Sequence, residues 1–145
     1  MAPLTTAERI RAVEHIIDYE FHDKALLEKA LGAAGATADP EGNKRIALVG
    51  DAVLRLAHHD SCYQDQASTG EMTISHNGKA ANENLSRICC SLGISVYIKL
   101  NPSARGVIQS SLMATTIEAI IGAVWLDLNI LGSHFPGGIT IPLRR

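Results

Sequence analysis

The chain has 145 residues, of which 46% are hydrophobic, so it is long and apolar enough to bury the core of a single domain. Its 13 Lys and Arg residues are outnumbered by 15 Asp and Glu residues, and the formal net charge of -2 excludes an overall basic field that recruits nucleic acid. Any RNA-binding surface must therefore be a local patch.

Membrane insertion and secretion are not expected for this chain. Its longest uncharged runs, residues 106–117 and 128–143, are too short and too broken by polar residues, Gly and Pro to span a bilayer, and no apolar signal core follows the first Met. The cysteines Cys62, Cys89 and Cys90 are odd in number and lack metal-ligand spacing, so we expect them to be reduced. We expect a soluble intracellular protein, cytoplasmic or nuclear, and leave a mitochondrial location open.

The N-terminal part of the chain predicts two helices followed by a loop. Thr5-Thr6-Ala7-Glu8 has the form of a capping box, and apolar residues at helical spacing continue this helix to about Asp18. Asp23 can cap a second helix. The apolar residues of the two helices are Ile10, Val13, Ile16, Ile17, Leu26, Leu27, Ala30 and Leu31. Residues 32–42 contain glycines and a proline, which favour turns, so they predict a loop.

Residues 43 to about 63 predict a central helix. Asn43 is a typical N-cap residue, and apolar residues follow at steps of three and four, the period of one buried helical face. These apolar residues are Ile46, Val49, Val53 and Leu56. Asp51 lies within this run, beside Gly50. A carboxylate buried without a partner costs several kcal/mol, so we expect Asp51 to be paired, hydrogen-bonded or bound to a metal.

The middle of the chain predicts more helices. Gly70 begins a helical region in which Gly78, a poor helix former, indicates a kink or two abutting helices. Residues 96–100 alternate like a strand, but we interpret them as a short helical turn because helices flank them on both sides. A loop marked by Pro102 follows.

The last predicted helix is the most apolar. Ser110 or Ser111 can cap a helix over Leu112 to Leu128, which we expect to be the buried core helix. We predict one domain over residues 1–131 and a flexible tail over residues 132–145, which contain several Gly and Pro residues.

The central helix closely resembles the signature of the ribonuclease III family, N-E-R-L-E-F-L-G-D-A-V-L. The matching residues are Asn43, Arg45, Gly50, Asp51, Ala52, Val53 and Leu54. The last helix is similar to the second signature, A-D-x-x-E-A-x-x-G-A-x-x-x-D, at Glu118, Ala119, Gly122, Ala123 and Asp127. Tyr19 and Phe21 fit the family's opening, Y-x-F-x-x-x-x-L-L-x-x-A-L. The resemblance covers about residues 19–127 and implies an all-α fold, that of the ribonuclease III endonuclease domain.

The resemblance also identifies a candidate site. In active family members, four carboxylates hold magnesium ions that activate a water and stabilise the phosphodiester transition state. Only Asp51 and Glu118 remain here, because Ala47 and Thr115 stand at the other two ligand positions. Each missing ligand would share a helical face with its surviving partner.

Asp51 and Glu118 together are called the catalytic remnant below, and two interpretations of them stay open. Asp51 and Glu118 bind Mg²⁺ or Mn²⁺ weakly, or they bind no metal and are satisfied by Arg45, Arg55, a hydroxyl or a backbone N–H. A transition-metal site with His58 is a less favoured alternative, because histidines near a helix end usually meet its dipole only.

Other departures from the family pattern concern RNA. Gly32-Ala33-Ala34-Gly35 replaces the polar motif T-H-R-S, and Lys44 replaces the first Glu of the signature. A basic strip for phosphate contacts can be drawn from Lys44, Arg45, Arg55, Lys79 and Arg87. Scattered basic residues are more often a solvated surface.

The resemblance implies a homodimer. Family members dimerise beside the signature helix, where a Phe of one subunit enters a socket in the other, and Leu48 stands at that position. We therefore expect Leu48 and Val49 at or near a two-fold interface.

Two classes of function compete. Half of the carboxylate set is missing and no double-stranded-RNA-binding domain is expected in these residues, which favours a catalytically impaired, dimeric RNA-binding or scaffold protein, for example in a ribonucleoprotein. The alternative is a divergent active ribonuclease III that cleaves double-stranded RNA with Mg²⁺ or Mn²⁺. A third, weaker alternative is a regulatory partner of a catalytically complete ribonuclease.

Overall fold

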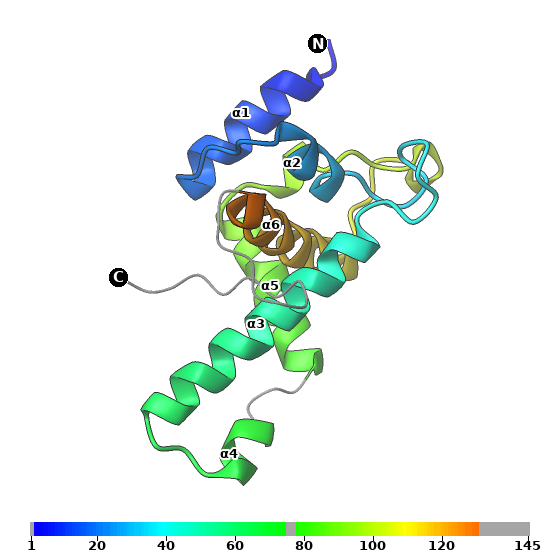
Figure 1. The fold of residues 1–145 in the computed structure, drawn as a ribbon. Helices are drawn as coiled ribbons and strands as arrows, with labels where there is room; N and C mark the ends of the chain where they lie inside the picture. Colours follow the sequence, from blue (N-terminus) through cyan, green and yellow to red (C-terminus); the bar gives the residue numbers. More distant parts are fainter. Residues whose placement is uncertain (1, 75–77, 131–145) are drawn as a thin grey trace.

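The computed structural model describes residues 2–74 and 78–130, which form helices joined by loops (Figure 1). The helices are α1 (Thr6–Ile17), α2 (Lys24–Ala30), α3 (Lys44–Gln64), α4 (Thr69–Ile74), α5 (Gly78–Ser91) and α6 (Ser110–Ile130), with two 3₁₀ turns, η1 (Ser95–Tyr97) and η2 (Pro102–Ala104). Within these ranges the β structure is a single parallel bridge between Gly32 and Lys99. The prediction of an all-α fold is confirmed.

The first two helices begin where their capping residues predict. At the start of α1, the Thr5 hydroxyl accepts a hydrogen bond from the Glu8 backbone N–H at 3.2 Å, and the Glu8 carboxylate accepts one from the Thr5 N–H at 2.7 Å. At the start of α2, the Asp23 carboxylate accepts a hydrogen bond from the Ala25 N–H at 3.0 Å. These bonds satisfy backbone donors that have no partner within the helix.

Helix α6 lies at the centre of the fold and packs against α2, α3 and α5 (Figure 1). Its buried residues include Ala114, Thr116, Ile117, Ala119, Ile120, Ala123 and Asp127. Among the described helices, only α6 is long and apolar enough, over Ser110–Asn129, to cross a membrane by length and composition. Its contacts with three other helices account for this apolar composition, as expected of a buried core helix.

The backbones of α3 and α6 touch where they cross. A Cβ added to Gly50 would lie 1.7 Å from the carbonyl oxygen of Glu118, and one added to Gly122 would lie 2.3 Å from the carbonyl oxygen of Ile46. Neither position accepts a side chain unless the helices move apart. These two glycines therefore set the distance between the two signature helices.

The buried face predicted for α3 is wrong beyond its first turns. Ile46 is buried, but Val53 is only half-buried and 57% of Leu56 is exposed. The buried residues of α3 are Ile46, Ala47 and Gly50, because only the N-terminal part of the helix lies against α6. The rest of α3 projects from the body of the molecule and leads to α4 (Figure 1).

Asn43 stands at the N-cap position of α3, but its side chain makes no capping bond. Its amide nitrogen instead donates to the Ala30 carbonyl at 2.9 Å and to the Thr116 hydroxyl at 3.2 Å. The buried Asn43 side chain thus ties the end of α2 to α6.

In the later part of the chain, the structure agrees only in part with the predictions from the sequence. Helix α4 ends at Ile74 and Gly78 begins a separate helix, α5, and the connection between them lies outside the described residues. The helical turn expected over residues 96–100 is found only at residues 95–97, and Lys99 instead lies in the bridge with Gly32. Ser110 and Ser111 lie inside α6 rather than at its N-cap. The tail predicted over residues 132–145 lies outside the described residues.

Candidate functional site

The crossing of α3 and α6 brings Asp51 and Glu118 together. Gly50 lies against the backbone of Glu118, and the next residue, Asp51, is close enough to act electrostatically on the Glu118 carboxyl group. Glu118 is half-buried, and both this burial and the Asp51 carboxylate raise its pKa, while Arg55 acts in the opposite direction. The two surviving acids of the signatures therefore interact.

Arg55 is the charged partner of this pair. Its Nε lies 3.2 Å from Oδ2 of Asp51, one helical turn earlier on α3, and the Arg55 and Asp51 side chains are 57% and 33% exposed. Asp51 was expected to have a partner, and in this structure that partner is Arg55.

The positions of the two missing ligands offer little to a metal ion. Ala47 is only 4% exposed, belongs to the apolar core and has no donor atom. Thr115 is half-buried, and its hydroxyl donates to the Ser111 carbonyl at 2.9 Å. In residues 2–74 and 78–130, no three His, Cys, Asp or Glu residues gather closely enough to hold a metal. The residues present do not fit a two-metal site, since Mg²⁺ prefers several oxygen ligands in octahedral geometry.

His58 does not join Asp51 and Glu118 in a metal-binding group of the described residues. Its Nε2 lies 3.5 Å from the sulfur of Cys62, one turn further along α3. The transition-metal alternative is therefore not supported by this arrangement. The three cysteines are free, as expected.

Most of the residues expected to form a basic strip are exposed. Lys44 and Arg45 lie in the first turn of α3, and Arg87 lies on α5. The side chain of Lys79 lies outside the described residues. These positions leave Lys44, Arg45 and Arg87 open to solvent and to an anionic partner.

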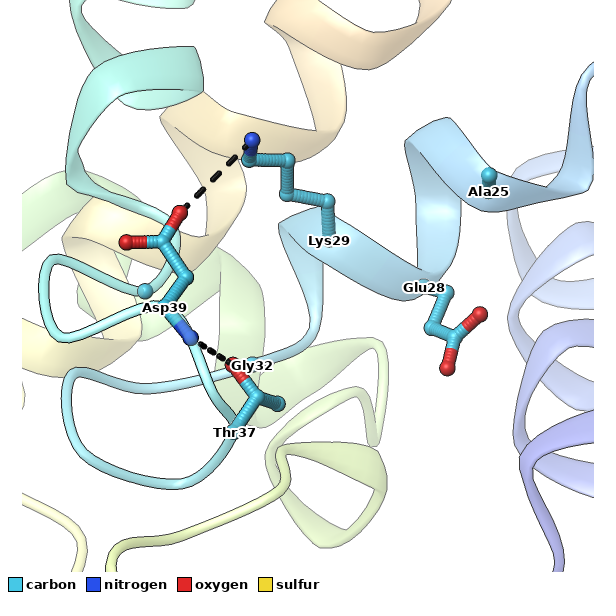
Figure 2. Close-up of a pocket in the computed structure, with 7 residues that line it drawn as sticks. Ala25, Glu28, Lys29, Gly32, Thr37 and Asp39 are labelled. Atoms are coloured by element: carbon cyan, nitrogen blue, oxygen red, sulfur yellow. Dashed lines mark hydrogen bonds and ion pairs between the residues drawn. The ribbon is translucent and has the colours of Figure 1, made fainter.

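Two hollows border the loop that replaces the T-H-R-S motif. The first, a cavity of about 230 Å³, lies between α2 and this loop, where Lys29 reaches toward Asp39 at 3.6 Å and the Asp39 N–H donates to the Thr37 hydroxyl at 3.3 Å (Figure 2). The second, of about 260 Å³, is lined by Ala33 and Ala34 among others. Neither hollow is lined by Asp51 or Glu118, so both are separate from the catalytic remnant.

Sequence reasoning gave no role to Asp127, although it matched the second signature. The buried carboxylate accepts hydrogen bonds from the Tyr19 hydroxyl at 2.7 Å, the His22 N–H at 2.9 Å and the Asp23 N–H at 2.8 Å. Burial alone would raise the pKa of Asp127, but these bonds and one from the His22 ring lower it to about 2. Asp127 therefore fastens the α1–α2 connection onto α6.

The structure thus defines an all-α domain in which two crossing helices each contribute one acid, Asp51 and Glu118, to a pair of interacting carboxyl groups. The family model described as Ribonuclease III domain matches residues 44–129, which include both helices. The chain therefore belongs to the ribonuclease III family.

Individual relatives agree with this assignment. Ribonuclease 3 of Shewanella pealeana is 30% identical over 119 residues, which are 79% of this chain and 52% of the relative. Ribonuclease 3 of Shewanella loihica is 30% identical over 135 residues, which are 90% of this chain and 58% of the relative. The chain thus spans about half the length of the curated relatives it matches.

A solved structure shares the fold. The nuclease domain of ribonuclease III from Campylobacter jejuni, described for structural flexibility in a region involved in dimer formation, matches with a TM-score of 0.72 and 28% identity. The match covers 81% of this chain and 85% of that chain. The similarity therefore extends over nearly the whole nuclease domain.

Proposed function

We propose that this protein binds double-stranded RNA, or acts as a dimeric scaffold in RNA processing, without cleaving RNA efficiently. The observation that carries the proposal is the state of the two ligand positions beside Asp51 and Glu118. One is Ala47, which is buried in the core, and the other is Thr115, whose hydroxyl donates to the backbone. Two carboxylates alone give Mg²⁺ too few protein ligands for the charge neutralisation that phosphodiester cleavage needs.

A gel assay tests this function. The natural protein should retard double-stranded RNA without added metal, and it should leave the RNA intact when Mg²⁺ or Mn²⁺ is added. Retardation should weaken as salt rises, because phosphate contacts are electrostatic. Efficient cleavage by the natural protein that is lost in Asp51→Asn would show that the non-catalytic proposal is wrong.

The second candidate function is a divergent, active Mg²⁺- or Mn²⁺-dependent ribonuclease III. The observation in its favour is that Asp51 and Glu118 interact across the helix crossing and that Asp51 is one-third exposed. In this alternative Thr115 and bound water would supply the remaining ligands. The same gel assay separates the two candidates.

Dimer formation is the second part of the proposal. Leu48, at the position of the family's plugging Phe, is 72% exposed, and Leu56 is exposed two turns later on the same helix, while Val49 is half-buried. Leu48 is therefore turned away from the core on the N-terminal part of α3, and Leu56 lies on the part of α3 that projects from the body of the molecule. The description of the Campylobacter jejuni domain in terms of dimer formation supports a homodimer.

We expect Leu48→Glu to convert the dimer into a monomer, because it places a charge in the apolar interface. Sedimentation velocity at several protein concentrations measures the change. Val107→Glu is the matched control, since Val107 is similarly exposed but lies outside α3. The dimer proposal is wrong if the natural protein sediments only as a monomer at high concentration. The assignment of Leu48 to the interface is wrong if Leu48→Glu remains a dimer, like Val107→Glu.

A further inference from the structure

The catalytic remnant already has a cation of its own. The Arg55 Nε is 3.2 Å from Oδ2 of Asp51, and the Arg55 charge also acts on Glu118. Arg55 therefore neutralises part of the charge of both acids. In a metal-binding member of the family, this neutralisation is the task of the divalent ions.

The chemistry of arginine makes this arrangement hard to reverse. A guanidinium keeps its proton at any physiological pH, so Arg55 cannot become neutral to make room for a second cation. An incoming Mg²⁺ or Mn²⁺ must compete with Arg55 for the Asp51 oxygens and is also repelled by its charge. With Ala47 and Thr115 at the other ligand positions, no further carboxylate compensates for that repulsion.

The pair contributes little to folding. More than half of the Arg55 side chain is exposed, and ion pairs in solvent stabilise proteins only slightly. The position of Arg55 is thus better explained by what it does to the charge of the site than by the stability of α3.

We propose that Arg55 is the resident counter-ion of Asp51 and Glu118 and that it keeps divalent cations out of the catalytic remnant. This inference rests on the proposed non-catalytic function and gives it a cause beyond the two lost ligands. Arg55 excludes the metal because its guanidinium holds the carboxylate oxygen that the ion needs.

A measurement of Mn²⁺ binding tests the proposal directly. Binding is detected by electron paramagnetic resonance as a loss of the signal of the free ion. The natural protein should bind Mn²⁺ with a Kd above about 1 mM, and Arg55→Gln should lower this Kd by about tenfold or more. Arg55→Lys, which keeps the charge, should bind as weakly as the natural protein. The control Arg11→Gln removes an exposed arginine from α1 and should change nothing.

Two further measurements complete the test. Adding Asp51→Asn to Arg55→Gln should abolish the gain, because the bound ion uses the Asp51 oxygens. Thermal unfolding of Arg55→Gln should stay within about 2 °C of the natural protein, as expected for an exposed ion pair.

The outcomes also separate this proposal from the proposed function. If Arg55→Gln binds Mn²⁺ no better than the natural protein, the counter-ion role is wrong, even if the natural protein does not cleave RNA. If the natural protein binds Mn²⁺ through Asp51 with a Kd well below about 1 mM, the proposal that Arg55 excludes divalent cations is also wrong. RNA cleavage by the natural protein in the gel assay would instead contradict the proposed function.

Discussion

Asp127→Ala should destabilise the protein by about 3–5 kcal/mol, because each of several partly buried donors left without an acceptor costs about 1–3 kcal/mol. The variant leaves the Tyr19 hydroxyl and the N–H groups of His22 and Asp23 without their shared acceptor. Chemical denaturation measures the loss. Asp65→Ala is the control, because Asp65 is an exposed acid at the end of α3. Equal unfolding midpoints for Asp127→Ala and the natural protein would contradict the assigned role.

The same network predicts how the stability of the natural protein depends on pH. Because folding lowers the pKa of Asp127 from 3.8 to about 2, its contribution is fully present above about pH 4 and is lost as the pH falls toward 2. The shift corresponds to about 2 kcal/mol, since the carboxylate is fully buried. Asp127→Asn should flatten the acid side of the stability profile between these pH values, whereas Asp65→Ala should leave its shape unchanged.

Local signals in the sequence predicted the start of several helices. Thr5 and Asp23 cap their helices through residues two or three positions away, so the short-range pattern contained the answer. The pairing of Arg55 with Asp51 is equally local, because residues four apart share a helical face. The prediction that α6 is the core helix followed from its almost continuous apolar composition.

Other features depend on contacts that periodicity cannot reveal. The apolar spacing of α3 predicted burial of Leu56, but spacing does not state how much of a helix lies over the core. The partners of Asp127 lie more than 100 positions earlier in the chain, so a single sequence gave only the clue of an acid in an apolar run. Asn43 fitted an N-cap by type, whereas the structure uses its amide between α2 and α6.

For the candidate site, the resemblance to the two signatures provided what spacing alone could not. Spacing places Ala47 with Asp51 and Thr115 with Glu118, but it does not indicate that the two helices meet there. The contact depends on Gly50, whose missing side chain allows the backbone of α6 to approach.

Restoring both missing acids, Ala47→Glu with Thr115→Asp, should raise metal-dependent cleavage of double-stranded RNA by about a hundredfold or more over the natural protein. Each restored acid would lie one helical turn from Asp51 or Glu118, which already interact across the crossing. Single restorations should achieve much less, because residues that act as a unit are strongly non-additive. Gel assays with Mg²⁺ and then Mn²⁺ compare the natural protein, both single variants and the double variant.

Arg55 makes a third substitution informative. If its guanidinium excludes metal, adding Arg55→Gln to the two restored acids should raise cleavage further. The same substitution in the natural protein should produce no cleavage, because only two carboxylates are then present. Equal activity of the double and triple variants would show that four carboxylates overcome the Arg55 charge without help.

The control for the restored acids must have the same bulk without the charge. Ala47 is buried, so a longer polar side chain there should cost about 1–3 kcal/mol of stability whether or not it binds metal. Ala47→Gln with Thr115→Asn carries this cost but supplies no carboxylates, and it should not cleave RNA. If the restored variants are folded and dimeric yet inert, the defect lies in RNA binding rather than in the metal site. Residues 32–35, which lack the polar motif, and Lys44, which replaces a Glu, are then the first positions to restore.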